Sequence, residues 1–349
     1  MRVLVTGHRG YVGTALVPLL ISQGHETEGM DADFFAGCSF GEPPLDIPHK
    51  KMDIRDARLS DLRGFEAVIH LAGLSNDPLG DLDPELTWEI NFKSSVRLAQ
   101  MAREAGVRRF VFSSSCSVYG AKDGEFVKET DTLEPVTPYA RSKVLAEKEI
   151  KRLEGPDFCP VFLRNATAYG FSPRIRFDLA LNNLMAWAFS TKKVYLKSKG
   201  NAWRPFVHVE DIARAFAAVL SVPLESVRGQ AFNVGETREN YQILAAARLV
   251  RDTAPGSEII FADGALEDIR CYRVNCDKIF AALPRFKTEW TLAKGARQLL
   301  DAYRKNTLSP DDFEGPRYKR IDHIHMLIRE GVLDKRLRFK QRESKTLGP

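Results

Sequence analysis

Short apolar runs alternate with longer stretches of helical periodicity along the first half of the chain. Runs of strand length occupy residues 2–5, 67–73 and 108–114, and the run at 26–31 ends in an acid. Residues 84–106 carry apolar side chains at helical spacing and stop at a glycine. This alternation predicts βαβ units, and therefore an α/β fold whose parallel sheet is doubly wound, with helices on both faces. Ligands of such sheets bind beyond the carboxyl ends of the strands.

The second half is predicted to pack directly on the first, because no repeat or low-complexity linker separates them. Near the C-terminus, apolar residues at 321, 324, 327, 328 and 332–333 predict an extra helix. This helix either covers the active site or joins two subunits. The long connection at 31–50 matches no pattern that we can interpret.

Composition narrows the class of protein. With 44% hydrophobic and 28% charged residues, the chain has the makeup of an ordinary globular protein of one large domain or two fused ones. The net charge of +5 is small and its basic residues are scattered, except at 335–345, so we expect no nucleic-acid partner. The five cysteines form neither a disulfide framework nor a zinc spacing, which favours a reducing cytoplasm and no metal. Neither a secretory leader nor a membrane span is expected.

The first candidate for chemistry is the glycine-rich stretch "TGHRGYVG" at 6–13. Gly7, Gly10 and Gly13 stand between a predicted strand and a predicted helix, where a Cβ would block the approach of backbone N–H groups to a pyrophosphate. Asp31 follows the second strand, at the place of an acid that bonds the adenosine ribose hydroxyls. A carboxylate there repels the 2′-phosphate of NADP, whereas Arg9 in the loop could pair with it. We predict NAD, with NADP as the alternative.

The second candidate is Tyr139 with Lys143, one helical turn apart, and Ser115 at the end of an earlier strand. Such a pair on a helix is often inert, but a parallel sheet brings Ser115 to the same edge. Tyrosine has a pKa of about 10, so a competent base at pH 7 requires a fall of about 3 units, or about 4 kcal/mol. One cation at about 4 Å supplies roughly that at an effective dielectric of about 20. We predict Tyr139 as the base, Lys143 with the positive nicotinamide ring beside it as the source of the charge, and Ser115 as the group that holds the substrate oxygen.

Together these motifs resemble the extended short-chain dehydrogenase/reductase family, in the branch that acts on nucleotide-activated sugars. The resemblance covers nearly the whole chain and includes "MDIRD" (52–56), "HLAG" (70–73), "SSSCSVYG" (113–120), "WRPFVHVEDIARAF" (203–216) and "FNVG" (232–235). It implies a Rossmann-type NAD-binding domain at 1–170 and a smaller C-terminal α/β substrate-binding region at 171–349. Part of 203–235 would return to the first domain, and a helical extension would occupy 309–345. The cofactor-binding set implied by the resemblance is Gly7, Gly10, Tyr11, Val12, Gly13, Asp31, Asp53, Ile54, Leu71, Ala72, Gly73, Asn91, Ser113, Tyr139 and Lys143.

The resemblance also suggests where the sugar nucleotide binds. It places Arg204 on the diphosphate, with Asn182 or Asn183 beside it, whereas Thr167 stands where the family usually has asparagine. The full set of expected substrate contacts is Ser115, Ser117, Thr167, Asn182, Asn183, Arg204, Arg174, Arg176 and Arg270. The last three are also compatible with exposed positions. A homodimer through the helices at 84–106 and 139–153 is expected on resemblance alone.

The loop before "VYG" bears on the reaction. Relatives that resemble sugar 4,6-dehydratases carry an Asp-Glu pair where this chain has Cys116 and Ser117. The hydroxyl set instead resembles that of UDP-galactose 4-epimerase, so we predict a nucleotide-sugar epimerase that recycles bound NAD. The alternatives are an NADPH-dependent keto-sugar reductase of the GDP-fucose synthase kind, a dehydratase or decarboxylase, and a non-catalytic NAD(H)-binding protein. Cys116 is expected to form a small polar wall of the site.

Overall fold

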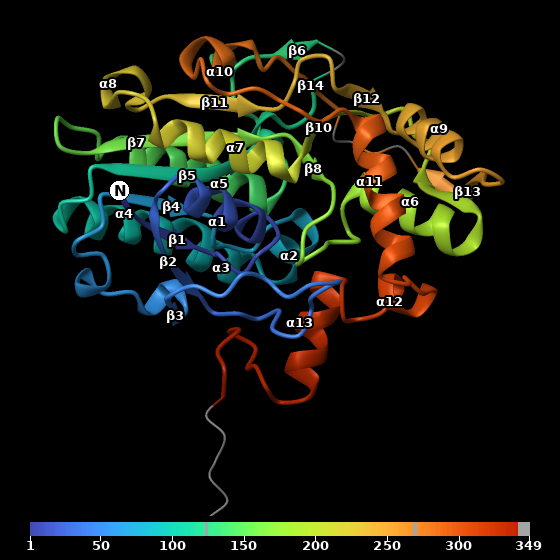
Figure 1. The fold of residues 1–349 in the computed structure, drawn as a ribbon, viewed down its shortest axis with the longest axis horizontal. Coiled ribbons are helices and arrows are strands. Elements are labelled where there is room, and N and C mark those ends of the chain that lie inside the picture. The colour runs from blue at the N-terminus through green and yellow to red at the C-terminus, as the bar shows by residue number, and fades with distance from the viewer. Residues whose placement is uncertain (123–124, 267, 269–270, 341–349) are drawn as a thin grey trace, which may run out of the picture.

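A seven-stranded parallel sheet forms the centre of the molecule (Figure 1). The structure is a computed structural model and describes residues 1–122, 125–266, 268 and 271–340. The strand order is β11-β7-β5-β4-β1-β2-β3, so the direction of winding reverses between β1 and β4. This is the Rossmann-type arrangement, and the predicted α/β fold class is confirmed. The strands are β1 (Arg2–Thr6), β2 (Glu26–Asp31), β3 (His49–Lys51), β4 (Ala67–His70), β5 (Arg109–Ser115), β7 (Cys159–Asn165) and β11 (Ala231–Val234).

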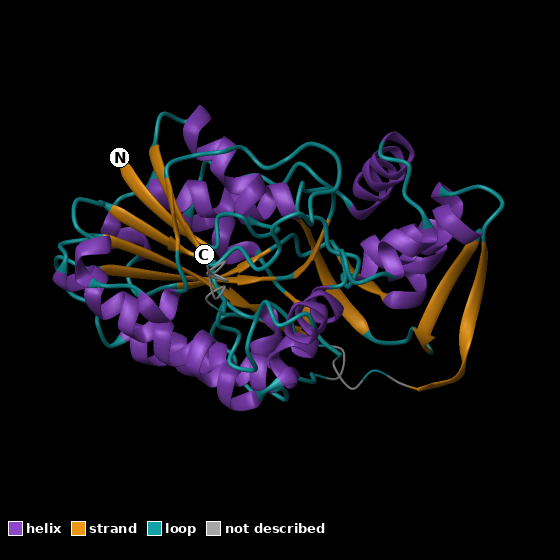
Figure 2. Cartoon of the chain, turned by 90° about the horizontal axis from the view of Figure 1, so that it is seen from below, coloured by secondary structure: helices purple, strands orange, loops and turns teal. Residues whose placement is uncertain are grey.

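Helices cover both faces of this sheet, as Figure 2 shows. Successive side chains of a strand point to opposite faces, so Val3 and Val5 of β1 enter one apolar cluster and Leu4 enters another. The first cluster is shared with α1 (Gly13–Ser22) and α7 (Val209–Leu220). The second is shared with α2 (Asp77–Leu82), α3 (Pro84–Thr87), α4 (Ser94–Glu104) and α5 (Pro138–Lys151).

The smaller part of the molecule has its own apolar cluster. Two short sheets contribute to it: β8 (Thr167–Tyr169) with β10 (Trp203–His208) and β12 (Asn240–Gln242), and β9 (Lys193–Ser198) with β13 (Glu258–Leu266). The cluster itself lies mainly among α6 (Ala180–Thr191), α9 (Ile243–Thr253) and α11 (Leu292–Lys305), with α12 (Pro310–Glu314) beside them. The short sheet of β6 (Phe126–Val127) and β14 (Arg273–Val274) and the helices α8 (Leu224–Val227) and α10 (Asp277–Ala282) instead contribute to the first cluster of the large sheet.

The extra C-terminal helix predicted from the apolar spacing is present as α13 (Arg320–Arg329). It lies beside the long connection that follows β2, below the sheet in Figure 1. The ring of His323 is 5.5 Å from that of Phe35, and further along the chain Phe339 lies 5.7 Å from Phe34. The connection at 31–50, which matched no pattern, therefore packs against the C-terminal helix, whose position the sequence left open.

The helix predicted at 84–106 is continuous but not uniform. Between α3 and α4, the segment Trp88–Lys93 is a π-helical turn, which a 3.6-residue apolar period does not reveal. Asn91 lies in this turn, and its amide group both accepts from Leu74 N (2.8 Å) and donates to Leu74 O (2.9 Å). The wider turn thus carries the side chain that fixes the loop after β4.

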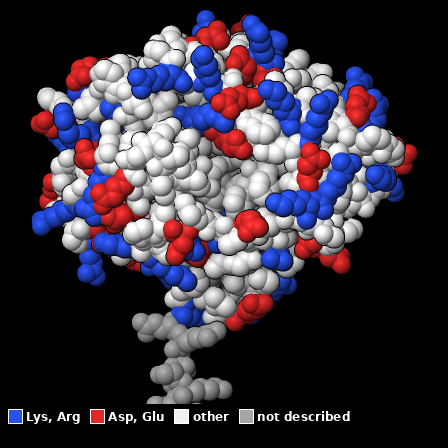
Figure 3. Space-filling view, in the orientation of Figure 1, with Lys and Arg blue, Asp and Glu red and all other residues white. Residues whose placement is uncertain are grey.

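The distribution of charged side chains on the surface and the apolar character of the helices agree with the composition of the sequence. On the face drawn in Figure 3, lysines and arginines are interspersed with aspartates and glutamates, and a recess opens near the middle. None of the helices in the described ranges combines the length and apolar character that crossing a membrane requires.

Two buried histidines predict an acid-sensitive fold. His70 pairs through Nδ1 with Thr6 Oγ1 (2.6 Å) and through Nε2 with Ser95 Oγ (2.8 Å), while His208 pairs with Gln298 and stacks on Trp290. Burial lowers the pKa of His70 to about 3 and that of His208 to about 4. The unfolded chain, with a histidine pKa of about 6.5, binds protons that the folded chain excludes. The contribution of each neutral histidine to the free energy of unfolding is therefore fully present above pH 6.5. It falls as the pH drops, by about 2 kcal/mol per histidine at pH 5.

Urea unfolding at pH 7 and pH 5 measures this difference. Changing His208 to glutamine is expected to remove about 2 kcal/mol of it, whereas the same change at the exposed His325 should leave it unaltered. Equal pH dependence in all three proteins would contradict the assignment.

Candidate active site

A cavity of about 480 Å³ lies at the carboxyl ends of β1, β4 and β5, where the winding of the sheet reverses. Its lining comes from the Rossmann sheet on one side and from the smaller part, including Thr167 and Arg204, on the other. This is the size and position of a small-molecule site in an open α/β sheet.

The glycine loop forms the floor of one half of the cavity. Gly7 has a φ of +74°, and a Cβ there would lie 2.7 Å from Ala72 N. A Cβ on Gly13 would lie 2.5 Å from the carbonyl oxygens of Gly7 and His8. Only glycine allows this loop to pack against residues 71–73 while α1 starts directly behind it. Its backbone N–H groups and the start of the helix form a cradle for phosphates.

Asp31 is held at the end of β2 by two backbone groups. Its carboxylate accepts hydrogen bonds from Arg9 N (2.9 Å) and Asp33 N (2.7 Å), and burial raises its pKa. The side chain of Arg9 is engaged by two acids, Asp33 at 3.5 Å and Asp46 at 3.0 Å. This arrangement favours ribose hydroxyls over a 2′-phosphate, in agreement with the prediction of NAD.

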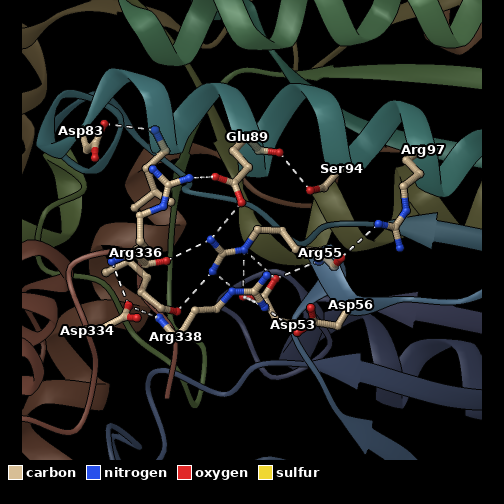
Figure 4. A network of polar contacts seen from close by, with 12 residues as sticks. Asp53, Arg55, Asp56, Asp83, Glu89, Ser94, Arg97, Asp334, Arg336 and Arg338 are labelled. Carbon is tan, nitrogen blue, oxygen red and sulfur yellow. Dashed lines mark hydrogen bonds and ion pairs between the residues drawn. The ribbon is translucent and has the colours of Figure 1, made fainter. Parts of the chain in front are cut away.

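Most of the predicted cofactor residues line the cavity. They are Gly7, Gly10, Tyr11, Val12, Gly13, Asp31, Asp53, Ile54, Leu71, Ala72, Gly73, Ser113, Tyr139 and Lys143. Asn91 does not line it, because its side-chain amide forms hydrogen bonds with the backbone N–H and the backbone oxygen of Leu74. We correct its role to positioning the loop at 73–75. Asp53 is held by the Arg55 guanidinium, within a larger network of charges (Figure 4).

The three predicted catalytic side chains meet in the cavity. Ser115 ends β5, and Tyr139 and Lys143 lie in the first two turns of α5, which Thr137 caps through a hydrogen bond from Ala140 N. Lys143 Nζ donates to Ser113 O (2.8 Å) and lies 5.8 Å from the centre of the Tyr139 ring. A sugar hydroxyl placed against Tyr139 would therefore also be within the reach of Ser115.

The pKa of Tyr139 differs from the prediction. Burial raises it to about 12, with the charge of Asp77 adding to the rise, while a hydrogen bond with Ser115 and the charge of Arg176 oppose it. The prediction attributed a lowered pKa to Lys143 together with the positive nicotinamide ring. Within the protein alone burial has the largest effect, and the Lys143 ammonium donates to Ser113 O. Burial also lowers the pKa of Lys143 to about 8, against the opposing charge of Glu147, so its ammonium is mostly protonated at pH 7.

A buried ion pair supports the catalytic helix from behind. Glu147, one turn after Lys143, receives hydrogen bonds from Arg164 Nε (3.1 Å) and Nη2 (2.7 Å) and from Ser114. Both charged side chains are less than a tenth exposed. Arg164 also donates to the hydroxyl of Tyr119 (3.0 Å). This cluster ties α5 to β5 and β7 directly beneath the reacting groups.

The predicted substrate residues divide into two groups. Ser115, Ser117, Thr167, Arg176 and Arg204 line the cavity. Asn182, Asn183 and Arg174 do not; the amide of Asn182 accepts from Gly170 N (2.9 Å) and donates to Arg176 O (3.0 Å), and Arg174 pairs with Asp33 and Ser39. Asn182 and Arg174 therefore shape the chain around the cavity, and Asn183 is not among the lining residues. Arg270 lies outside the described residues.

Cys116 is also placed differently from expectation. It is fully buried, and its thiol donates to Arg164 O (3.1 Å), so it belongs to the core and not to the cavity wall. The short 3₁₀ turn Cys116–Tyr119 directs this side chain inward while Ser117 reaches the cavity.

Several lining residues escaped sequence reasoning. The side-chain amide of Asn165 donates to Ser113 Oγ (3.1 Å), and its oxygen, Oδ1, is buried without a hydrogen-bond partner in the described chain. Asp178 pairs with Arg176 (2.6 Å), and Arg320 and Ile324 enter the cavity from α13. The apolar spacing of α13 was the only signal for the last two, and it left open whether that helix reaches the site.

Comparison with known proteins gives a consistent result. The sequence profile of the NAD dependent epimerase/dehydratase family matches residues 3–235. The UDP-glucose 4-epimerase of Mycolicibacterium smegmatis is 29% identical over 324 residues, covering 88% of this chain and all of the relative. A Bacillus subtilis protein named uncharacterized UDP-glucose epimerase YtcB is 30% identical, covering 72% of this chain and 82% of its own.

Solved structures agree. MoeE5 in complex with UDP-glucuronic acid and NAD superposes with a TM-score of 0.75 at 25% identity, covering 88% of this chain and 100% of its own. The UDP-glucose 4-epimerase of Thermotoga maritima has the same fold, with a TM-score of 0.77 at 22% identity over 88% of this chain and 100% of its own. The resemblance read from the motifs is confirmed: this chain belongs to the NAD dependent epimerase/dehydratase family, and NAD is its cofactor.

Proposed function

We propose that this chain is a nucleotide-sugar epimerase that uses bound NAD to oxidise a sugar hydroxyl transiently and then returns the hydride to the other face. The observation that carries the proposal is the chemistry of the reacting end of the cavity. It presents the hydroxyls of Ser115, Ser117 and Tyr139 and the ammonium of Lys143. These groups can transfer one proton and hydrogen-bond to the oxygen on the reacting carbon, which is what oxidation and reduction at a single carbon require.

The carboxylates of the cavity support epimerisation over dehydration. Expelling water from a sugar needs an acid for the leaving oxygen in addition to the base. Each carboxylate that lines the described part of the cavity already has a partner: Asp31 with Arg9 N, Asp33 with Arg9, Asp53 with Arg55, Asp77 with Thr137, Asp178 with Arg176 and Asp268 with Arg204. The hydroxyl of Ser117, by contrast, is buried without a partner within the described ranges.

The residues then act in a fixed order. When bound, NAD supplies the acceptor and donor of the hydride and a positive charge beside Tyr139. With that charge and the Lys143 ammonium favouring its phenolate form, Tyr139 would take the proton of the sugar hydroxyl as the hydride leaves that carbon, and Ser115 would hold the resulting carbonyl oxygen. The keto sugar would then rotate in the cavity, so that the hydride returns to the opposite face of its carbonyl carbon. Tyr139 would return the proton to the oxygen. No net oxidation results, so the cofactor stays in place.

We further propose that the substrate is a UDP-hexose and that the carbon is C4. The relatives named UDP-glucose 4-epimerase support this choice. The test is incubation of the purified protein with UDP-glucose or UDP-galactose, with product analysis and a record of NADH absorbance. Interconversion of the two sugars without net NADH formation is expected. Accumulation of a 4-keto-6-deoxy sugar would instead identify a dehydratase, and stoichiometric consumption of NADPH would identify a reductase.

The organisation of the chain is part of the proposal. We infer an NAD-binding domain at 1–170 and a substrate-binding region at 171–349, from which α7 and β11 return to the first sheet. We also infer a cytoplasmic protein, supported by five free cysteines, and a homodimer through α4 and α5. Trp88, which is 39% exposed beside Phe92 at the start of that face, supports the dimer. Light scattering of the parent and of Trp88→Glu tests it: a dimer that becomes a monomer is expected.

A further inference from the structure

The C-terminal helix α13 contributes to the cavity although it lies beyond the region matched by the family profile, which ends at residue 235. Arg320, its first residue, is 4% exposed, and Ile324 follows one turn later on the same side. Both line the cavity. A long cationic side chain buried in a ligand cavity calls for a partner, because an uncompensated buried charge is costly.

The partners of Arg320 among the described residues leave one of its guanidinium nitrogens without a hydrogen bond. Its guanidinium lies 3.7 Å from the centre of the Phe35 ring, and Nη2 donates to Arg174 O (3.1 Å). Nη1 is buried and has no hydrogen-bond partner in the parts of the chain that the structure describes. The carboxylate that favours its charge, Asp178, is already bound by two nitrogens of Arg176. Burial lowers the pKa of Arg320 only to about 10, so it remains a cation at pH 7.

Two further cations lie near Arg320. The guanidinium groups of Arg174 and Arg176 both act on it electrostatically and lower its pKa. The carboxylates beside them are engaged by other arginines: Asp33 lies 3.5 Å from both Arg9 and Arg174, and Asp178 is bound by Arg176. None of them hydrogen-bonds Arg320 Nη1 in the described chain, so this buried donor calls for an anionic acceptor.

The position of Arg320 indicates which anion. On one side it stacks on Phe35, four residues beyond the ribose-binding Asp31. On the other side is Arg176, whose charge reaches both Tyr11 of the glycine loop and the catalytic Tyr139. Arg320 therefore lies between the adenosine end and the nicotinamide end of the cavity. The diphosphate is the anionic part of a dinucleotide and lies between these ends.

We propose that Arg320 binds the diphosphate of NAD from the side opposite the glycine loop, so that the C-terminal segment forms the outer wall of the cofactor site. The backbone N–H groups of the glycine loop would hold one face of the diphosphate and Arg320 Nη1 the other. A guanidinium is suited to phosphate oxygens in charge and in shape. The diphosphate of the sugar nucleotide is the other possible source of this chemistry, and the test separates the two.

The segment after α13 is fixed at the adenine end of the same cavity (Figure 4). Arg55 donates to the backbone oxygens of Arg336 (2.9 Å) and Leu337 (3.3 Å) while it also holds Asp53. Arg336 in turn pairs with Glu89, and Arg338 with Asp56. Arg320 and Ile324 thus line the cavity, and the segment that follows their helix is tied through Arg55 to Asp53, which also lines it. Slow release of NAD is the expected consequence.

The test compares the parent with Arg320→Met and with Arg329→Met, an exposed arginine on the same helix. Bound NAD is quantified after denaturation, its release is timed against excess fluorescent etheno-NAD, and UDP binding is measured by calorimetry with saturating NAD. Arg320→Met is expected to release NAD about 10- to 100-fold faster, because it loses a charged hydrogen bond, and to bind UDP as the parent does. Arg329→Met should match the parent in both.

Unchanged release of NAD from Arg320→Met would overturn the proposal, and so would a loss confined to UDP, which would assign the arginine to the substrate. If the methionine variant does not fold, Arg320→Gln keeps a donor for Arg174 O and is judged by the same measurements. The inference rests on NAD binding and not on the sugar reaction. Failure of the proposed epimerase activity would therefore leave these binding results intact.

Discussion

Replacing Tyr139 with phenylalanine is expected to lower kcat by about three orders of magnitude while NAD remains bound. The phenolic oxygen is the group that we assign to carry the proton, and phenylalanine keeps the aromatic ring and the Cβ that lies close to Gly80. The loss should appear in kcat more than in KM, because the hydroxyl acts on the reacting oxygen and not on the nucleotide. Steady-state interconversion of UDP-glucose and UDP-galactose measures it.

A matched control comes from the same helix. Ser142 donates its hydroxyl to Tyr139 O (2.7 Å) and does not line the cavity, so Ser142→Ala changes the helix without removing a reacting group. It is expected to keep kcat within about threefold of the parent, since one neutral hydrogen bond is worth about 1 kcal/mol of stability. More than a tenth of the parental kcat in Tyr139→Phe would rule out Tyr139 as the base.

The second large effect is expected from Glu147→Gln. Removing this carboxylate leaves the buried Arg164 guanidinium without its bidentate partner, at a cost of about 3–5 kcal/mol in the free energy of unfolding. Lys143 also loses the charge that raises its pKa, so its pKa should fall below the present value of about 8. Urea unfolding measures the first effect, and the pH profile of kcat reports the second.

Glu149→Gln serves as the comparison for this variant. Glu149 lies on the same helix and pairs with Arg152 at the surface, where the arginine is 62% exposed. A surface pair of this kind is worth about 0.5 kcal/mol, so the control should unfold almost as the parent does. Equal losses in the two variants would show that the buried pair has no special role.

The sequence predicted the fold where the physical signal is local. Buried strands such as β1 and β4 are continuous apolar runs, and the glycines at 7 and 13 are required by backbone contacts that no other residue tolerates. For the same reason the loop, Asp31 and the triad of Ser115, Tyr139 and Lys143 could be placed in one cavity from spacing and sheet topology alone.

The sequence could not predict the direction and the partners of individual side chains, because packing decides between alternatives that the sequence leaves equal. Cys116 and Ser117 are neighbours in a turn, and only the turn geometry decides that the thiol enters the core while the hydroxyl faces the cavity. Asn182 is polar and near the site, but its amide is consumed by Gly170 and Arg176. The pKa of Tyr139 is raised mainly by burial, which depends on the packing around it. Arg320 could not be assigned because its contacts, Phe35 and the backbone oxygen of Arg174, are distant in the sequence.

The contact between residues 320–338 and the connection after β2 has a consequence for biosynthesis. Domains fold from the N-terminus as the chain emerges from the ribosome. Here β1, β2 and the glycine loop emerge first, but the outer wall of their cavity is encoded in the last described stretch of the chain. A nascent chain can thus form the sheet early and admit NAD through an open side. Retention of the nucleotide through Arg320 begins only once residues 320–338 have been made, and a chain without them would leave this side of the cofactor cavity open.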